Sequence, residues 1–239
     1  TSLGGVACRP DAWDEAGERR AELRDASDFL SLDPGTDEAM RTAVDEARAA
    51  KDSLGGAFEV RATGLPPGLG SCASGPERLT ARIGGGLFSI PAIKGVEFGI
   101  GFEVAERRGS DVHDAIVPGE PPEPFARATN RAGGLEGGMS TGEPIVVRAA
   151  MKPIPSIRIG MPTVDLHSGE AVRATYQRSD VTSVPACSVV GEAMVAMVLA
   201  EAFLEKYGGD SMDQVAAALE HHRAEIAGLG RPASADETS

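Results

Sequence analysis

The chain has 239 residues, of which 41% are hydrophobic, 25% charged and 4% aromatic. That length can bury a sizeable core as one large domain or two small ones, and the composition is typical of a soluble globular protein. The formal net charge of -13 argues against a nucleic-acid partner, because phosphate neutralisation needs a basic face, but a local Lys/Arg cluster can still hold a small anion.

The cysteines exclude two kinds of stabilising site. Cys8, Cys72 and Cys187 are scattered, predict no disulfide framework and suit a reducing cytoplasm. They also show no metal-ligand spacing, so we expect no metal.

The apolar runs and the N-terminal residues bear on where in the cell the protein is expected. No apolar run is expected to reach a membrane span, since the most apolar stretch, 188–207, is interrupted by Glu192 and Glu201. Nothing at the N-terminus resembles a signal peptide. Because the first residue is Thr1 and the opening reads like part of a strand, we expect the sequence to be part of a longer chain.

The first predicted elements surround one strand. Residues 11–25, rich in charge and alanine, are expected as a loop or a short helix. Thr36 is predicted to cap a helix over 37–50, which Gly55–Gly56 ends. Alternation in 57–64 then predicts a half-buried strand with Phe58, Val60 and Ala62 on one face.

The middle of the chain holds a helix rich in glycine and two strands. Helical spacing covers 77–88, although Gly84, Gly85 and Gly86 each cost about 1 kcal/mol relative to alanine. Close packing against another element, or an early helix end, would explain them. Residues 90–102 predict a strand plus turn, and 143–153 a strand that ends at Pro153.

Two helices close the predicted fold. Residues 185–207 are apolar on most faces and are expected to be buried. Ser211 and Gln214 form a capping box for a helix over 212–227, and from Gly228 the polar tail is expected to be disordered. Strands and helices do not alternate strictly, which predicts the α+β class.

The segment 129–144, TNRAGGLEGGMSTGEP, holds five glycines in sixteen residues. Strands flank it, so it is not a Gly/Ser linker, and it has neither Walker nor dinucleotide spacing. Two explanations stay open: a set of tight turns, or a backbone that must lie flat against a ligand.

Two short basic stretches can carry chemistry. Lys152, followed by Ser156 and Arg158, fits phosphate binding, and the alternative is a basic strand end at the surface. Arg178 and Asp180 would share a face of an extended segment, and the alternative is a surface ion pair.

The histidines add no site. His113, His167, His221 and His222 lie in no catalytic constellation, and the sequence has no nucleophile elbow. Residue chemistry alone therefore predicts only that the protein binds an anionic ligand, with phosphate as a candidate.

A set of motifs carries a resemblance to a known family: GLPPGLGS (64–71), LFSIPAIKGVEFGIGF (87–102), GSDVHD (109–114), the glycine segment continued to 157, TVD (163–165), QRSD (177–180) and GEAMVAMVLAEAFLEKYGGDS (191–211). In this order and spacing the chain resembles chorismate synthases from about Thr1 to Ser211. The resemblance implies an α+β sandwich with helices packed between antiparallel sheets, incomplete at the N-terminus. Residues 1–227 would then be the C-terminal part of a single chorismate synthase domain, with a disordered tail over 228–239.

Some features of the family pattern are missing. The upstream Gly-Glu-Ser-His-Gly motif, the paired-arginine segment, the Pro-Gly-His motif and the Arg-Ala-Ser helix do not occur in this sequence. Ser179 stands where many members have histidine, and Thr141 where many have asparagine.

The resemblance implies an activity. Chorismate synthases eliminate phosphate from 5-enolpyruvylshikimate 3-phosphate (1,4-anti elimination) to give chorismate in the shikimate pathway. They require reduced FMN without net redox change, and NADPH is a candidate flavin reductant. The family also implies a cytoplasmic homotetramer with no nucleic-acid or membrane partner. The alternative is a truncated, non-catalytic half that binds flavin or serves in assembly.

The family's site residues are carried over only where the motifs match. Asp180 matches the carboxylate proposed to manage the proton on flavin N5. The flavin contacts fall on Pro91, Ala92, Gly137, Lys152, Pro153, Ile154, Pro155, Ser156 and Arg178.

Overall fold

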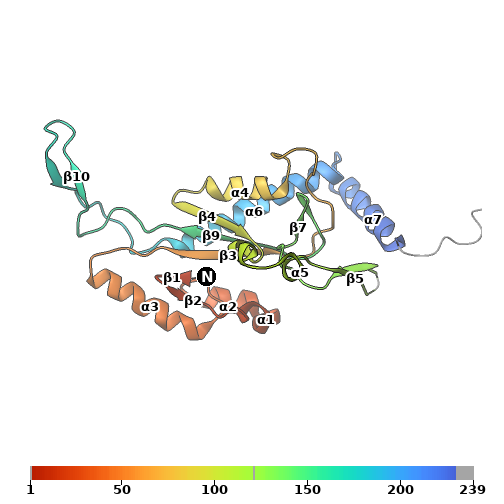
Figure 1. Cartoon of the computed structure of the whole chain (residues 1–239), viewed down its shortest axis with the longest axis horizontal. Helices are drawn as coiled ribbons and strands as arrows, with labels where there is room; N and C mark the ends of the chain where they lie inside the picture. The colour runs from red at the N-terminus through yellow and green to blue at the C-terminus, as the bar shows by residue number, and fades with distance from the viewer. Residues whose placement is uncertain (1, 121, 230–239) are drawn as a thin grey trace, which may run out of the picture. The chain divides into compact units, whose positions relative to one another are not determined.

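The computed structural model describes residues 2–120 and 122–229 (Figure 1). These fall into two compact units. The described residues of the first are 2–60, 87–96 and 148–193, and those of the second are 61–86, 97–120, 122–147 and 194–229. Most of the tail expected from Gly228 onward, residues 230–239, lies outside the described residues.

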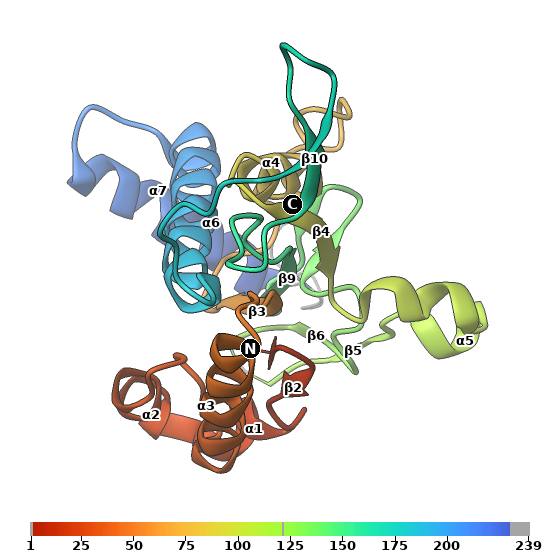
Figure 2. The same ribbon diagram turned by 90° about the vertical axis from the view of Figure 1, so that its left-hand side faces the viewer.

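The first unit opens with a short hairpin and a group of helices. Strands β1 (Ser2–Leu3) and β2 (Val6–Ala7) pair antiparallel. The helical elements α1 (Ala12–Ala16), η1 (Gly17–Arg19), α2 (Arg20–Ala26) and α3 (Pro34–Ala49) lie beside them in both views (Figures 1 and 2). The stretch 11–25 is therefore helical. A buried cluster of Leu3, Phe29, Met40 and Val184 holds this group together.

Helix α3 begins earlier than expected. Pro34 occupies its first position, where a missing N–H costs nothing, and Asp33 is the N-cap residue. The Thr36 hydroxyl donates to Asp33 Oδ2 at 2.6 Å from within the first turn. The prediction that Thr36 caps a helix from Asp37 was thus wrong, because the Asp33–Pro34 pair supplies the start.

The largest sheet has the strand order β2-β1-β3-β9-β4. It adds β3 (Gly56–Ala62), β4 (Ile93–Phe98) and β9 (Ile145–Met151) to the opening hairpin. Phe58 and Val60 are buried and Ala62 half-buried, which confirms the predicted alternation. The remaining strands form three antiparallel hairpins: β5 (Ile116–Pro118) with β6 (Phe125–Arg127), β7 (Leu135–Glu136) with β8 (Met139–Ser140), and β10 (Pro162–Val164) with β11 (Ala171–Arg173). With the helices, these antiparallel pairings confirm the α+β prediction.

Helix α4 (Leu79–Phe88) runs through its three glycines, so the early-end explanation was wrong. A Cβ at Gly84 or Gly85 would meet nothing within 4 Å, and one at Gly86 would make only ordinary contacts. Close packing within the described residues therefore does not explain Gly84 and Gly85. The shorter helical elements that follow are η2 (Gly101–Glu106) and α5 (Gly109–Val112).

Helix α6 (Val184–Tyr207) is less buried than its composition predicts. One face packs tightly, since a Cβ at Gly191 would lie 2.3 Å from the Phe58 ring. The opposite face exposes apolar side chains, including Met197 at 65% and Leu204 at 51%. The expectation of a fully buried helix was therefore wrong. Apolar residues on all sides of a helix predict that other elements pack against every face, but the described residues pack against only one face of α6.

By length and composition α6 is also the one helix in 2–120 and 122–229 that could cross a membrane, with a mean hydropathy of 1.8. Core helices of water-soluble proteins meet the same criterion. The expectation that no apolar run approaches the length and hydropathy of a membrane span was therefore wrong for α6.

The last helix, α7 (Met212–Gly228), starts at the predicted residue, Met212. The Gln214 N–H donates to Ser211 Oγ at 3.4 Å, as the capping box requires. The Gln214 side chain accepts from the backbone N–H of Asp210 at 2.6 Å instead of that of Ser211, so the box is only half formed.

The glycine segment lies in the second unit, and all five of its glycines have positive φ. A Cβ at Gly133 would lie 2.4 Å from the Gly99 nitrogen, so the chain's own backbone requires glycine there. A Cβ at Gly137, in the β7–β8 turn, would meet nothing within 4 Å. Tight turns thus account for part of the segment, and only positions such as Gly137 leave room for a ligand.

Buried Asp114 fixes the start of this segment. Its carboxylate accepts from Thr129 Oγ1 at 2.5 Å and from the N–H groups of Arg131 and Ala132 at 2.8 and 2.9 Å. Burial raises the pKa of Asp114, but these hydrogen bonds outweigh that effect, and the pKa lies below its ordinary value.

Candidate anion-binding site

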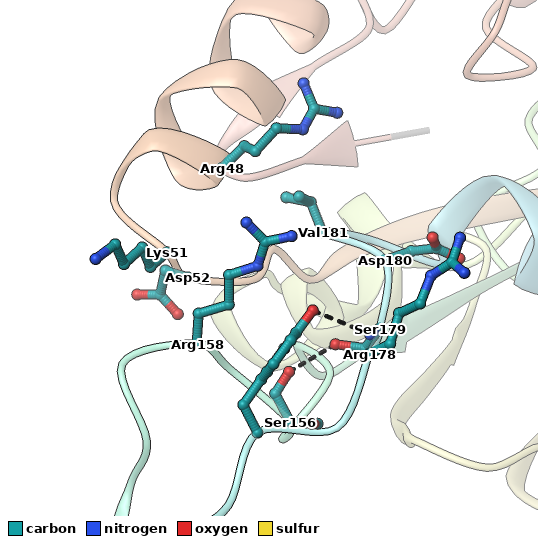
Figure 3. Close-up of a pocket in the computed structure, with 10 residues that line it drawn as sticks. Arg48, Lys51, Asp52, Ser156, Arg158, Arg178, Ser179, Asp180 and Val181 are labelled. Atoms are coloured by element: carbon teal, nitrogen blue, oxygen red, sulfur yellow. Dashed lines mark hydrogen bonds between the residues drawn. The ribbon is translucent and has the colours of Figure 1, made fainter.

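A cavity of about 230 Å³ lies in the first unit (Figure 3). Three segments line it: the end of α3, the stretch that follows β9, and the stretch before α6. The lining residues are Arg48, Lys51, Asp52, Ser156, Arg158, Tyr176, Arg178, Ser179, Asp180 and Val181.

Hydrogen bonds to backbone carbonyls hold the three segments together. After β9, the Lys152 N–H donates to the Ala92 carbonyl at 2.9 Å. The Ser53 hydroxyl then donates to the carbonyl of Ile154 at 2.6 Å, and the Leu54 N–H donates to the carbonyl of Val181 at 2.7 Å. The α3 end is therefore bonded to both of the other walls.

Two serines join the second wall to the third. Ser156 Oγ donates to the Gln177 carbonyl at 2.7 Å and accepts from the Gln177 N–H at 3.0 Å. Ser179 Oγ donates to the Ser156 carbonyl at 2.6 Å, and its N–H donates to Tyr176 Oη at 3.3 Å. These bonds fix the backbone on both sides of Arg178.

Arg158 and Tyr176 lie against each other beside the serines. The Arg158 guanidinium lies 5.5 Å from the centre of the Tyr176 ring. The hydrogen bond from Arg158, followed by that from the Ser179 backbone, lowers the pKa of Tyr176 from its ordinary value, because both favour the phenolate.

The cavity is basic in an acidic protein. Four cationic side chains and two carboxylates line it, a surplus of two positive charges in a chain of net charge -13. Arg48 pairs with Asp45. Within 2–120 and 122–229, Lys51, Arg158 and Arg178 have no carboxylate partner at ion-pairing distance. All three side chains are exposed and therefore solvated, and the positive charge that they share around one cavity favours an anionic ligand over a cationic one.

Arg178 and Asp180 extend to the same side of their segment, as the two-residue spacing predicts (Figure 3). No ion pair forms between them at the 4.0 Å limit. The alternative explanation of these two residues, a surface ion pair, is therefore not what the structure shows.

Comparison with known proteins gives the family. The sequence model of chorismate synthase matches residues 4–204. A chorismate synthase of Thermobifida fusca is 53% identical over 211 residues, covering 88% of this chain and 53% of the relative. One from Frankia alni is 56% identical over 191 residues, covering 80% of this chain and 48% of the relative. A crystal structure of chorismate synthase superposes with a TM-score of 0.75 at 40% identity, covering 93% of this chain and 59% of that one.

The chain belongs to the chorismate synthase family. The expected fold of helices with antiparallel sheets is thereby confirmed. The chain spans about half the length of the curated chorismate synthases that it matches.

Apart from Gly137, the positions taken from the chorismate synthase motifs fall into three groups. Ser156, Arg178 and Asp180 line the cavity. Lys152, Pro153, Ile154 and Pro155 form the segment that leads from β9 to Ser156. Pro91 and Ala92 precede β4, and the Ala92 carbonyl accepts from Lys152.

Ala92 is also a backbone outlier, with φ +73°. A non-glycine residue in this region costs free energy and is found where the surroundings demand it, often at binding sites. Gly137 belongs to the second unit, where its turn leaves open space.

Five lining residues were not predicted: Arg48, Lys51, Asp52, Tyr176 and Val181. Tyr176 adjoins the QRSD motif, which could have marked it. The end of α3 carries no recognisable motif, and it joins the site through hydrogen bonds that span about a hundred residues of sequence.

The residues present fit the anionic part of the cofactor that the family uses. Arg178 offers charge and hydrogen-bond donors, and Ser156, committed to Gln177, holds the backbone beside it. The cavity is smaller than the 300–1,000 Å³ typical of sites for drug-sized ligands, so it can enclose only part of FMN.

Proposed function

We propose that the chain supplies flavin- and substrate-binding residues of a chorismate synthase. The reaction is the 1,4-anti elimination of phosphate from 5-enolpyruvylshikimate 3-phosphate, which gives chorismate and requires reduced FMN. The observation that supports this proposal best is the basic cavity in which Ser156, Arg178 and Asp180 converge from two motifs. Family membership supports a lyase of aromatic amino-acid biosynthesis.

The binding roles follow from charge. Arg178 has no carboxylate partner in the described ranges, so its guanidinium is available to an anionic ligand. Lys152 brings a second cation along the adjoining segment; its Nζ lies 3.4 Å from the Pro153 carbonyl. Ser156 is committed to Gln177 and holds the walls in place. Pro91, Ala92 and Gly137 would contribute backbone surface.

Asp180 has a different role. A carboxylate among ligands that are themselves anionic weakens their binding, so affinity does not explain its presence. Its carboxylate oxygen is suited to hold and release a proton beside the cofactor. Reduced FMN, when bound, supplies the chemistry that helps phosphate depart and takes up the ring hydrogen.

The same proposal includes the wider assembly. A cytoplasmic homotetramer, with NADPH as a candidate flavin reductant, follows from the family resemblance. No observation on the chain favours the alternative of a non-catalytic assembly half.

Flavin titration tests the proposal directly. We expect reduced FMN to bind the chain saturably, with riboflavin binding more weakly because it lacks the phosphate. Equal, non-saturating responses to both flavins would refute the proposed site. Turnover is then measured after adding a polypeptide that covers the part of the Thermobifida fusca relative that this chain does not match.

A further inference from the structure

The C-terminal end of α3 has an unusual residue at its turn. The Lys51 N–H donates to the Arg48 carbonyl at 3.1 Å, and the Asp52 N–H donates to the Ala47 carbonyl at 2.9 Å. This pair of bonds defines a Schellman motif, in which the residue at the position of Lys51 is usually glycine because the backbone is left-handed. Lys51 has φ +60°.

A lysine at this position is not explained by stability. Glycine or asparagine adopts the left-handed conformation at lower free energy. A cation near a helix C-terminus is favourable, but Ala49 and Ala50, both exposed, could carry it in ordinary helical conformation. Within the described ranges Lys51 has no carboxylate partner, so an ion pair does not hold it there.

What Lys51 does share is the cavity. Arg158 stands on the facing wall, beside Tyr176 and without a carboxylate partner in the described ranges. In Figure 3 the Arg158 guanidinium extends toward α3, the Arg48 guanidinium extends away from it, and the Lys51 ammonium points away from both. The flexible lysine stem allows that ammonium to turn toward a ligand.

We propose that Lys51 and Arg158 form an anion subsite that binds a phosphate monoester. It is separate from the end of the cavity that holds Arg178 and Asp180, and it includes no residue that the family motifs assign to flavin. The inference deepens the proposed function and rests on it for the identity of the ligand. The subsite accounts both for the lysine in a strained conformation and for the surplus of positive charge.

The test separates the effect of the Lys51 charge on anion binding from the effect of its left-handed backbone on stability. Lys51→Asn removes the charge but tolerates left-handed backbone, and Lys51→Gly removes both charge and strain. Arg158→Gln removes the facing charge, and Lys206→Gln removes a lysine that does not line the cavity. Inorganic pyrophosphate is titrated against the 239-residue chain and each variant by calorimetry.

We expect Lys51→Asn and Arg158→Gln each to weaken pyrophosphate binding about 3- to 10-fold, the range for a partly exposed charged contact. Lys206→Gln should stay within about 2-fold of the unchanged chain. Lys51→Gly should raise Tm by about 2–4 °C while losing the same affinity. Unchanged affinity in Lys51→Asn, no pyrophosphate binding by the unchanged chain, or a lowered Tm in Lys51→Gly would each overturn the subsite.

Two flavins identify the source of the phosphate. If the subsite holds the flavin phosphate, Lys51→Asn weakens FMN binding and leaves riboflavin binding unchanged. If it holds the substrate phosphate, FMN binding is unchanged and pyrophosphate still binds the FMN complex. Arg178→Ala serves as the separate control on the proposed function, since unchanged FMN affinity in that variant refutes the flavin site and not the subsite.

Discussion

Arg178 and Asp180 differ in what they can do although they lie two residues apart on one face. We expect Arg178→Ala to weaken FMN or substrate binding by about 1.5–3 kcal/mol, since a charge-assisted contact is lost. Asp180→Asn keeps the shape of the side chain but removes the base. It should lower kcat about 10²-fold or more with FMN binding nearly intact.

Flavin titration and saturating-substrate kinetics on a catalytically complete assembly measure this separation. If instead both substitutions reduce stability and binding together, and kcat at saturation is spared, the two residues serve only to hold their loop. The absence of an ion pair between them makes that outcome unexpected.

Asp114 gives a prediction about pH. Because its folded-state pKa is depressed, its contribution to stability is present above the unfolded-state value of about 4 and is lost as pH falls through the folded-state pKa. We expect Asp114→Asn to lower the free energy of unfolding at pH 7 by about 1–3 kcal/mol. The difference should shrink below about pH 4, as urea unfolding at pH 7 and pH 3 would measure. Asp111→Asn, at an exposed neighbour, is the control, and a difference independent of pH would contradict the assignment.

At the scale of elements, the glycines of α4 and α6 should respond oppositely to alanine. Gly84→Ala and Gly85→Ala meet open space, so each should stabilise the chain by about 1 kcal/mol. Gly191→Ala places a Cβ against the Phe58 ring and should destabilise it by about 1–3 kcal/mol. Thermal unfolding of the three variants checks both signs. Destabilisation by Gly84→Ala would mean that another surface packs on α4 in the folded protein.

Periodicity predicted the elements well where burial is one-sided. β3 and β9 alternate clearly along their length, and α7 begins at a cap visible in the sequence. It failed at the start of α3, where Thr36 was a plausible cap but Asp33–Pro34 was the actual start. The burial prediction also failed for α6. Hydropathy indicates that an apolar face should be packed against something, but it does not indicate whether the same chain supplies the packing surface.

The candidate site was predictable only in part. Motif resemblance located Ser156, Arg178 and Asp180, which the structure does bring to one cavity. Residue type gave no sign of Lys51, since a left-handed lysine looks like any other lysine in a sequence. The wall from α3 depends on hydrogen bonds between distant segments, such as Ser53 to Ile154, which no local pattern encodes.

At the scale of the molecule, the exposed face of α6 should drive association. A contiguous apolar face on a folded chain normally marks an interaction surface. We expect the 239-residue chain to self-associate as its concentration rises, and the double substitution Met197→Lys with Leu204→Lys to reduce this strongly. Sedimentation velocity measures it. Phe102→Lys, which removes an 82% exposed apolar side chain from η2, is the control, and an equal effect of that change would contradict the role of α6.

The β10–β11 hairpin has a consequence for how this part of the protein can vary. Ser156 and Gln177 exchange two hydrogen bonds across 21 residues, so the chain leaves the cavity wall and returns to it through a closed base. Beyond that base nearly every hairpin residue is exposed, and Leu166 near its tip is 93% exposed. Both views show the hairpin extending away from β1, β2 and α3 (Figures 1 and 2). Outside the TVD motif (163–165), residues 160–174 are thus a module whose length and sequence can change without moving the residues that line the cavity. Closing a longer or shorter loop on the same base costs only fractions of a kcal/mol, so evolution can rebuild this arm for new partners while the cavity stays as it is.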